Sequence, residues 1–145
     1  MNYKYFGLKF GRMSATVSLD RSFLGTPDSH TAVWLGVNDY HNKAWVQGGV
    51  EDQGMNIAPQ AYIEVGKNGN QAQFIHWPVQ LGEKVKVKLR RVGKIWTVTV
   101  KIRGTKIHSR SVHIIDPTVD SMLEIQGKAK ATAHIDRRQV RGNTL

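Results

Sequence analysis

The stretch from Thr31 to Gly66, TAVWLGVNDYHNKAWVQGGVEDQGMNIAPQAYIEVG, decides the fold. It contains three runs, 32–37, 44–50 and 61–65, in which aliphatic residues alternate with aromatic, polar or glycine residues. Successive side chains of a strand point to opposite faces, so each run places its aliphatic side chains on one face. The opposite face collects Trp, Tyr, Gln and Glu side chains. This composition predicts a lined groove rather than an ordinary solvated sheet.

The expected groove face takes residues from the three runs and from one later strand. Its side chains are Trp34, Trp45, Gln47, Tyr62, Glu64 and Glu124; Asn38, directly after the first run, has the parity of Trp34 and is a further candidate for substrate contact. The aliphatic residues that alternate with them are expected to form the core.

Strand-type alternation recurs along the whole chain, while helical periodicity with a capping sequence is absent. The expected strands are 15–19, 32–37, 44–50, 61–65, 73–77, 84–92, 95–103, 106–114, 122–126 and 130–136. Turn-forming residues such as Asn68-Gly69 and Gly93-Lys94 separate them. Short strands at this spacing predict an all-β, two-sheet antiparallel jelly-roll sandwich. We expect one domain spanning 1–145, with 137–145 as a basic, frayed end.

The positive charge is concentrated in one segment. The chain has 21 Lys and Arg against 11 Asp and Glu, and residues 83–113 hold ten of the basic residues with Glu83 as the one acid. Alternation on two of the expected strands places most of these cations on the wet face. This basic ridge comprises Lys84, Lys86, Lys88, Arg90, Lys101 and Arg103. Such a local patch bears on partners rather than on fold, and it predicts a polyanion as partner.

Several classes of function have no support in the sequence. The chain has no Cys, and its six His residues show no metal-binding spacing, so we expect neither a metal nor a cofactor. No apolar run reaches the length of a membrane span. The N-terminal residues show no signal peptide, which predicts a cytoplasmic location unless a leader has been removed. No phosphate-binding or dinucleotide-binding glycine motif occurs.

The spacing within the opening stretch resembles the glutamic peptidase (eqolisin) family. Trp34-x-Gly36-Val37 is followed by Gln47-x-Gly49, then by an aromatic residue with Glu64, and later by Gly82-Glu83-Lys84-Val85-Lys86-Val87. The resemblance covers about Thr31 to Val100. The chain departs from the family pattern at Asn38, where the family favours Asp.

This resemblance implies a concanavalin-like jelly roll and an endopeptidase activity. It implies that Gln47 is the catalytic glutamine, that Trp34 and Glu64 lie in the substrate groove, and that Glu124 is the catalytic carboxylate. In such a pair the carboxylate takes a proton from the attacking water, and the amide donates to the developing oxyanion.

Two further hypotheses stand beside the peptidase. The groove could belong to a non-catalytic, lectin-like module that binds a glycan or peptide, with Asn38, Trp45 and Tyr62 among its contacts. Alternatively, the function could lie on the basic ridge, where a polyanion would bind through charge with little sequence readout. The oligomeric state does not follow from the sequence.

Overall fold

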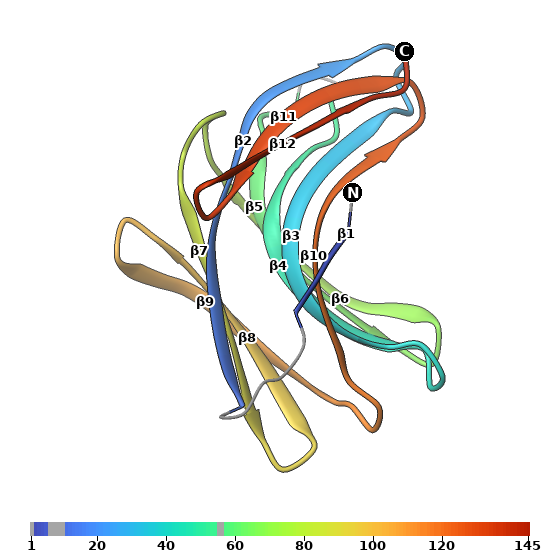
Figure 1. Ribbon diagram of the computed structural model, residues 1–145, viewed down its shortest axis with the longest axis vertical. Coiled ribbons are helices and arrows are strands. Elements are labelled where there is room, and N and C mark those ends of the chain that lie inside the picture. Colours follow the sequence, from blue (N-terminus) through green and yellow to red (C-terminus); the bar gives the residue numbers. More distant parts are fainter. Residues whose placement is uncertain (1, 6–10, 55–56) are drawn as a thin grey trace.

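The computed structural model describes residues 2–5, 11–54 and 57–145, and it shows an all-β sandwich of two six-stranded sheets (Figure 1). Sheet A has the order β1 (Asn2–Tyr5), β10 (Thr118–Gln126), β3 (His30–Asp39), β4 (Ala44–Asp52), β5 (Gln60–Lys67) and β6 (Asn70–Pro78). Sheet B has the order β12 (Arg138–Asn143), β11 (Ala129–Ile135), β2 (Arg12–Leu24), β7 (Val85–Val92), β8 (Ile95–Ile102) and β9 (Thr105–His113). Neighbouring strands are antiparallel throughout. The predicted fold class is therefore confirmed.

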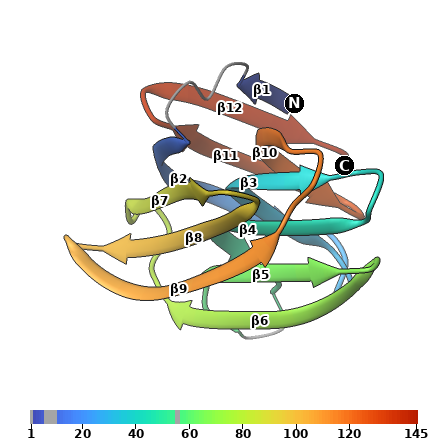
Figure 2. The ribbon, with the colours of Figure 1, turned by 90° about the horizontal axis from the view of Figure 1, so that it is seen from below.

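The two sheets stack with corresponding edges on the same side. Figure 2 shows β1 and β12 at one side of the sandwich and β6 and β9 at the other, in agreement with the strand orders. Sheet A curves away from sheet B, so that one of its faces covers the core and the other is concave and open (Figure 1). No described segment forms an apolar helix of membrane-spanning length.

The core lies between the sheets and is built from the aliphatic faces predicted by alternation. On β3, Val33, Leu35 and Val37 are fully buried in it. From sheet B, Trp96 enters the same core with 1% of its surface exposed, and its strand neighbours Thr97 and Thr99 face outward. Burial of this apolar area is the main favourable contribution to folding.

The C-terminal segment differs from the prediction. Residues 137–145 were expected to fray, but Arg138–Asn143 forms the edge strand β12 and pairs with β11. Val140, which is 2% exposed, fixes this strand to the core opposite Ala133. One buried aliphatic residue and a pairing with the adjacent strand are enough to order a segment that otherwise has polar and charged side chains.

Candidate functional site

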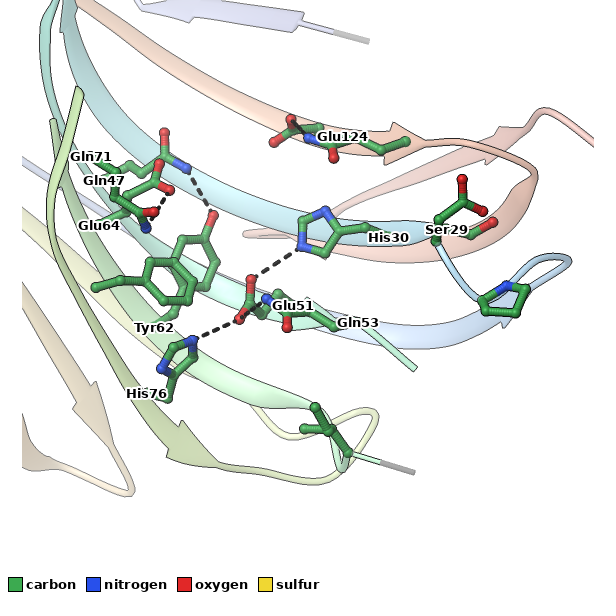
Figure 3. Close-up of a pocket in the computed structure, with 15 residues that line it drawn as sticks. Ser29, His30, Gln47, Glu51, Gln53, Tyr62, Glu64, Gln71, His76 and Glu124 are labelled. Carbon is green, nitrogen blue, oxygen red and sulfur yellow. Dashed lines mark hydrogen bonds and ion pairs between the residues drawn. The ribbon is translucent and has the colours of Figure 1, made fainter. Parts of the chain in front are cut away.

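The concave face of sheet A holds a groove with a volume of about 700 Å³ (Figure 3). The strand register explains why its residues meet: Trp34 on β3, Gly49 on β4 and Tyr62 on β5 lie side by side in one row across the sheet, followed by His76 on β6. Side chains two residues away in either direction share this face. The predicted common face of the three runs is thus present in the structure.

Glu64 on β5 is held by two N–H donors. The Trp45 indole Nε1 donates to its Oε2 at 2.9 Å, and the Gln71 amide donates to its Oε1 at 3.2 Å. Burial raises the pKa of the Glu64 carboxyl, the bond from Trp45 opposes that shift, and the charges of Glu124 and Glu51 add to it.

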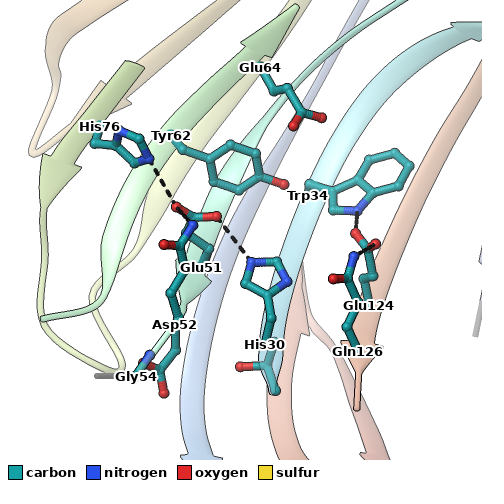
Figure 4. Close-up of polar contacts among 12 residues, drawn as sticks. His30, Trp34, Glu51, Asp52, Gly54, Tyr62, Glu64, His76, Glu124 and Gln126 are labelled. Carbon is teal, nitrogen blue, oxygen red and sulfur yellow. Dashed lines mark hydrogen bonds and ion pairs between the residues drawn. The ribbon is translucent and has the colours of Figure 1, made fainter. Parts of the chain in front are cut away.

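Glu124 on β10 repeats this arrangement on the opposite side of the groove (Figure 4). The Trp34 indole Nε1 donates to its Oε2 at 3.1 Å, and the Gln126 amide donates to its Oε1 at 2.8 Å. Trp34 is only 5% exposed. It is not among the residues that line the groove; it acts as a donor to Glu124 and is too covered to be a stacking platform for a ligand.

A third carboxylate, Glu51 on β4, is 3% exposed and lies between two imidazoles (Figures 3 and 4). His30 Nε2 lies 3.1 Å from its Oε2, and His76 Nε2 lies 3.3 Å from its Oε1. The Gln53 amide also donates to Oε1, at 3.1 Å. Burial lowers the pKa of His30, but the Glu51 carboxylate outweighs that effect and raises it overall.

The three carboxylates share one design, in which an indole or imidazole nitrogen lies on one oxygen and a glutamine amide on the other. An ionised carboxylate offers about four lone-pair positions, so each group keeps acceptor capacity after these bonds are made. The orientation of every acceptor is fixed before a ligand arrives, which reduces the entropy lost on binding.

Gln47 lies in the groove, as predicted, and is 9% exposed. Its amide donates to the Tyr62 hydroxyl oxygen at 3.0 Å. Burial, followed by the charges of Glu124 and Glu51, holds the pKa of Tyr62 well above its usual range. The phenol thus stays protonated.

The structure does not bring Gln47 and Glu124 together. Gln47 pairs with Gly36, which pairs with Asp120, whereas Glu124 lies four residues further along β10. From strand spacing and rise, their Cα atoms are roughly 16 Å apart. The carboxylate directly opposite Gln47 is Glu64, its partner on β5.

Asp120 is a buried acid that the sequence reasoning did not select. It is 1% exposed, shares the row of Gln47 across Gly36, and accepts hydrogen bonds from Asn38 (3.1 Å) and from the Tyr40 hydroxyl. Asn38, a predicted substrate contact, is therefore engaged with this acid and is not among the residues that line the groove.

His30, Glu51 and His76 were also missed. His30 has the same strand parity as Trp34, and Glu51 has the same parity as Gln47, so longer strands in the prediction would have found both. None of the described His, Asp and Glu side chains forms a group of three or more that could hold a metal ion.

Gly66 explains how Trp45 reaches Glu64. A Cβ atom at position 66 would lie 2.0 Å from Cε2 of the Trp45 ring, so the ring packs directly on the bare glycine backbone. Gly66→Ala is therefore expected to displace the indole, break its bond to Glu64 and lower the free energy of unfolding by about 1–3 kcal/mol. Urea unfolding and the indole N–H resonance of Trp45 measure the two effects. An unchanged resonance would contradict this account of the packing.

The basic ridge lies on sheet B, on the face that points away from the core. Lys86, Lys88 and Arg90 alternate with the buried Val85, Val87 and Leu89 on β7, and Lys101 lies opposite Lys86 on β8. The groove and the ridge thus occupy different sheets, and none of the described residues that line the groove is Lys or Arg.

Comparison with known proteins shows the fold. No protein-family model matches the chain, and no curated protein matches it significantly. Among solved structures, Scytalido-glutamic peptidase with a peptide-based transition-state analogue is similar at TM-score 0.59 and 13% identity, over 99% of this chain and 85% of that one. The chain is also similar to an alginate lyase from Klebsiella pneumoniae, at TM-score 0.56 and 12% identity, over 91% of this chain and 59% of that one. A carbohydrate-binding module from Bacillus subtilis is similar at TM-score 0.50 and 12% identity, over 86% of this chain and 70% of that one. At such identities the likeness establishes a shared β-sandwich.

Proposed function

We propose that the groove of sheet A binds a neutral, hydroxyl-rich glycan. The observation that carries this proposal is the set of three pre-oriented carboxylates, Glu51, Glu64 and Glu124, none of which is paired with Lys or Arg among the described residues. Sugar hydroxyls donate hydrogen bonds to carboxylates, and bonds to charged acceptors are stronger than bonds to neutral ones.

The charge of the groove selects against acidic ligands. In the part of the chain that the structure describes, its lining includes these three carboxylates together with Asp28, and contains neither Lys nor Arg. An acidic polysaccharide would bring further negative charge next to the fixed carboxylates, which are partly desolvated and hence repel it strongly. A neutral glycan meets no such repulsion.

The groove also supplies amides and an apolar floor. Gln47, Gln53 and Gln71 line it with groups that both donate and accept, as sugar hydroxyls require. Phe74, which is half-buried, presents aromatic surface to the C–H faces of a sugar ring, and the buried Tyr62 packs behind it with ring centroids 5.5 Å apart. The volume of about 700 Å³ is in the usual range for a ligand site.

Glycan arrays followed by isothermal titration calorimetry test this proposal. We expect a neutral oligosaccharide to bind, and Glu64→Gln or Glu124→Gln each to weaken it about tenfold, because each removes a charge-assisted hydrogen bond. Glu83→Gln on the opposite sheet is the matched control and is expected to leave affinity unchanged. Exclusive binding of acidic glycans, or wild-type affinity in both groove variants, would refute it.

The second candidate is a peptidase, favoured by the Trp34-to-Gln47 spacing and by a buried Gln47 amide in the groove. In it Glu124 is the general base and Gln47 the oxyanion donor. Because Gln47 and Glu124 lie far apart in the register, binding is the better supported function. Digestion of an unfolded protein between pH 2 and 7, with Gln47→Ala, Glu124→Ala and Glu64→Ala variants, separates the two. Cleavage abolished by Gln47→Ala would support the peptidase.

A further inference from the structure

We propose that the basic ridge on the outer face of sheet B is a second binding site, for an acidic polysaccharide, on the side of the sandwich opposite the groove. It is independent of the groove, shares no residue with it and takes an anionic ligand, whereas the ligand proposed for the groove is neutral.

The register concentrates like charges on this face. Lys86 on β7 lies directly opposite Lys101 on β8, and on the other side of β7 Arg90 lies opposite Arg12 of β2. Like charges at opposed positions of a sheet destabilise it. The neighbouring strands β2, β7 and β8 thus hold like charges at opposed positions, and a bound anion would reduce their repulsion.

Neighbouring acids do little to neutralise these cations. Among the described residues, the one ion pair on the ridge joins Arg103 to Glu83 at 3.4 Å, with the arginine side chain 82% exposed. Contact with the Lys101 amine, together with the charges of Lys101 and Lys86, lowers the pKa of Lys88. The ammonium groups are close enough to affect one another, and none of the described carboxylates forms an ion pair with these three lysines.

One end of the ridge is hollowed. A depression of about 580 Å³ is lined by Lys84, Lys86, Lys101 and Arg103, with Thr16 and Glu83 at its side. Four cations converge there on one volume, which suits a sulfate or carboxylate group of a ligand.

The rest of the ridge suits a ligand with repeated anions. Lys86, Lys88 and Arg90 are alternate residues of β7, so their spacing along the strand is roughly 6.6 Å, and Lys84 directly precedes the strand. Beside them Thr97 and Ser111 bond each other at 2.7 Å, as do Thr99 and Ser109 at 2.6 Å. These hydroxyls can exchange hydrogen bonds with the hydroxyls of a sugar chain.

The same face is poorly suited to nucleic acid. Trp96, the aromatic residue of β8, points into the core, so no ring of β7 or β8 alternates with the ridge cations to stack on bases. The exposed ring of Phe23 lies beside Lys130, beyond the part of β2 that pairs with β7. A six-stranded sheet is too broad for the DNA major groove, which admits a helix or a two-stranded ribbon. Lysines, which are point charges, outnumber the forked arginines that phosphate recognition favours.

Binding of heparin oligosaccharides and of a duplex DNA of equal charge, measured across a salt series, tests the proposal. Heparin is expected to bind more tightly than DNA, with an affinity that falls as salt rises. The triple variant Lys86→Gln, Lys88→Gln, Lys101→Gln is expected to lose roughly thirtyfold or more in affinity. Because the triple variant removes like charges, its thermal unfolding midpoint should not fall.

The matched control removes three exposed lysines elsewhere, Lys43→Gln, Lys67→Gln and Lys128→Gln, which changes net charge equally. It should retain affinity within threefold, and Glu64→Gln in the groove should leave heparin binding intact. An equal loss of affinity in the control variant would show that only net charge matters, and it would refute the ridge as a binding site. If DNA bound through the ridge at least as tightly as heparin, the ligand would not be a polysaccharide. If heparin did not bind at all, both the site and its ligand would be refuted.

Discussion

Gly49→Ala is expected to lower the free energy of unfolding by about 3 kcal/mol or more, a large effect for one methyl group. A Cβ atom at position 49 would lie 1.9 Å from the Val33 carbonyl oxygen and 2.7 Å from the Trp34 Cα. Both atoms belong to the backbone of β3, which pairs with β4 at this point. The methyl group can be accommodated only if the central ladder of sheet A opens.

Urea unfolding with an unchanged slope is the appropriate measurement. Gly93→Ala is the matched control: a Cβ there meets nothing within 4 Å, and its φ of +61° alone costs roughly 1–2 kcal/mol. Equal losses in the two variants would contradict the close approach of β3 to β4. The same contact matters to the site, because the absence of a side chain between Trp34 and Tyr62 leaves room for the groove.

Glu51→Ala is expected to lower the free energy of unfolding by about 3 kcal/mol at pH 5.5, because it leaves two imidazoles and an amide without their buried acceptor. The wild-type protein should be more stable at pH 5.5 than at pH 8. A raised His30 pKa contributes stability below about pH 6.5 that is lost as the pH rises through the folded value. The raised Glu64 pKa acts in the same direction from about pH 4.5 upward.

Chemical unfolding of both proteins at the two pH values measures this effect. Glu51→Ala should reduce the difference between pH 5.5 and pH 8, whereas Glu83→Ala, which breaks the exposed pair with Arg103, should preserve it. A wild-type stability that rises towards pH 8 would show that the His30 imidazole does not bond Glu51 in its charged form.

Strand parity alone predicts which side chains share a face. It was sufficient to place Trp34, Gln47, Tyr62 and Glu64 on the same face of sheet A. It could not predict which residues are neighbours across the sheet, because that depends on the order of strands. β10 lies between β1 and β3 in the sheet, although it is far from both along the chain. Its register with β3 places Asp120, and not Glu124, in the row of Gln47.

The sequence did not predict His30, Glu51 or strand β12, and the reasons are equally specific. His30 and Glu51 lie at strand ends, one or two positions outside the alternating runs, where the pattern fades. Strand β12 carries one buried aliphatic residue, Val140, which is too weak a periodic signal to distinguish it from a loose end. The basic ridge was placed correctly because Lys86, Lys88 and Arg90 alternate with three buried aliphatic residues.

The indole N–H resonances test the proposed glycan site most directly. Trp34 and Trp45 donate to Glu124 and Glu64, which line the groove, while the indole nitrogen of Trp96 is buried in the core and bonds none of the described residues. On titration with a neutral oligosaccharide, nitrogen–proton correlation spectra should show the Trp34 and Trp45 signals move together and the Trp96 signal stay in place. Stationary Trp34 and Trp45 signals across a broad panel of neutral glycans would contradict the proposed function.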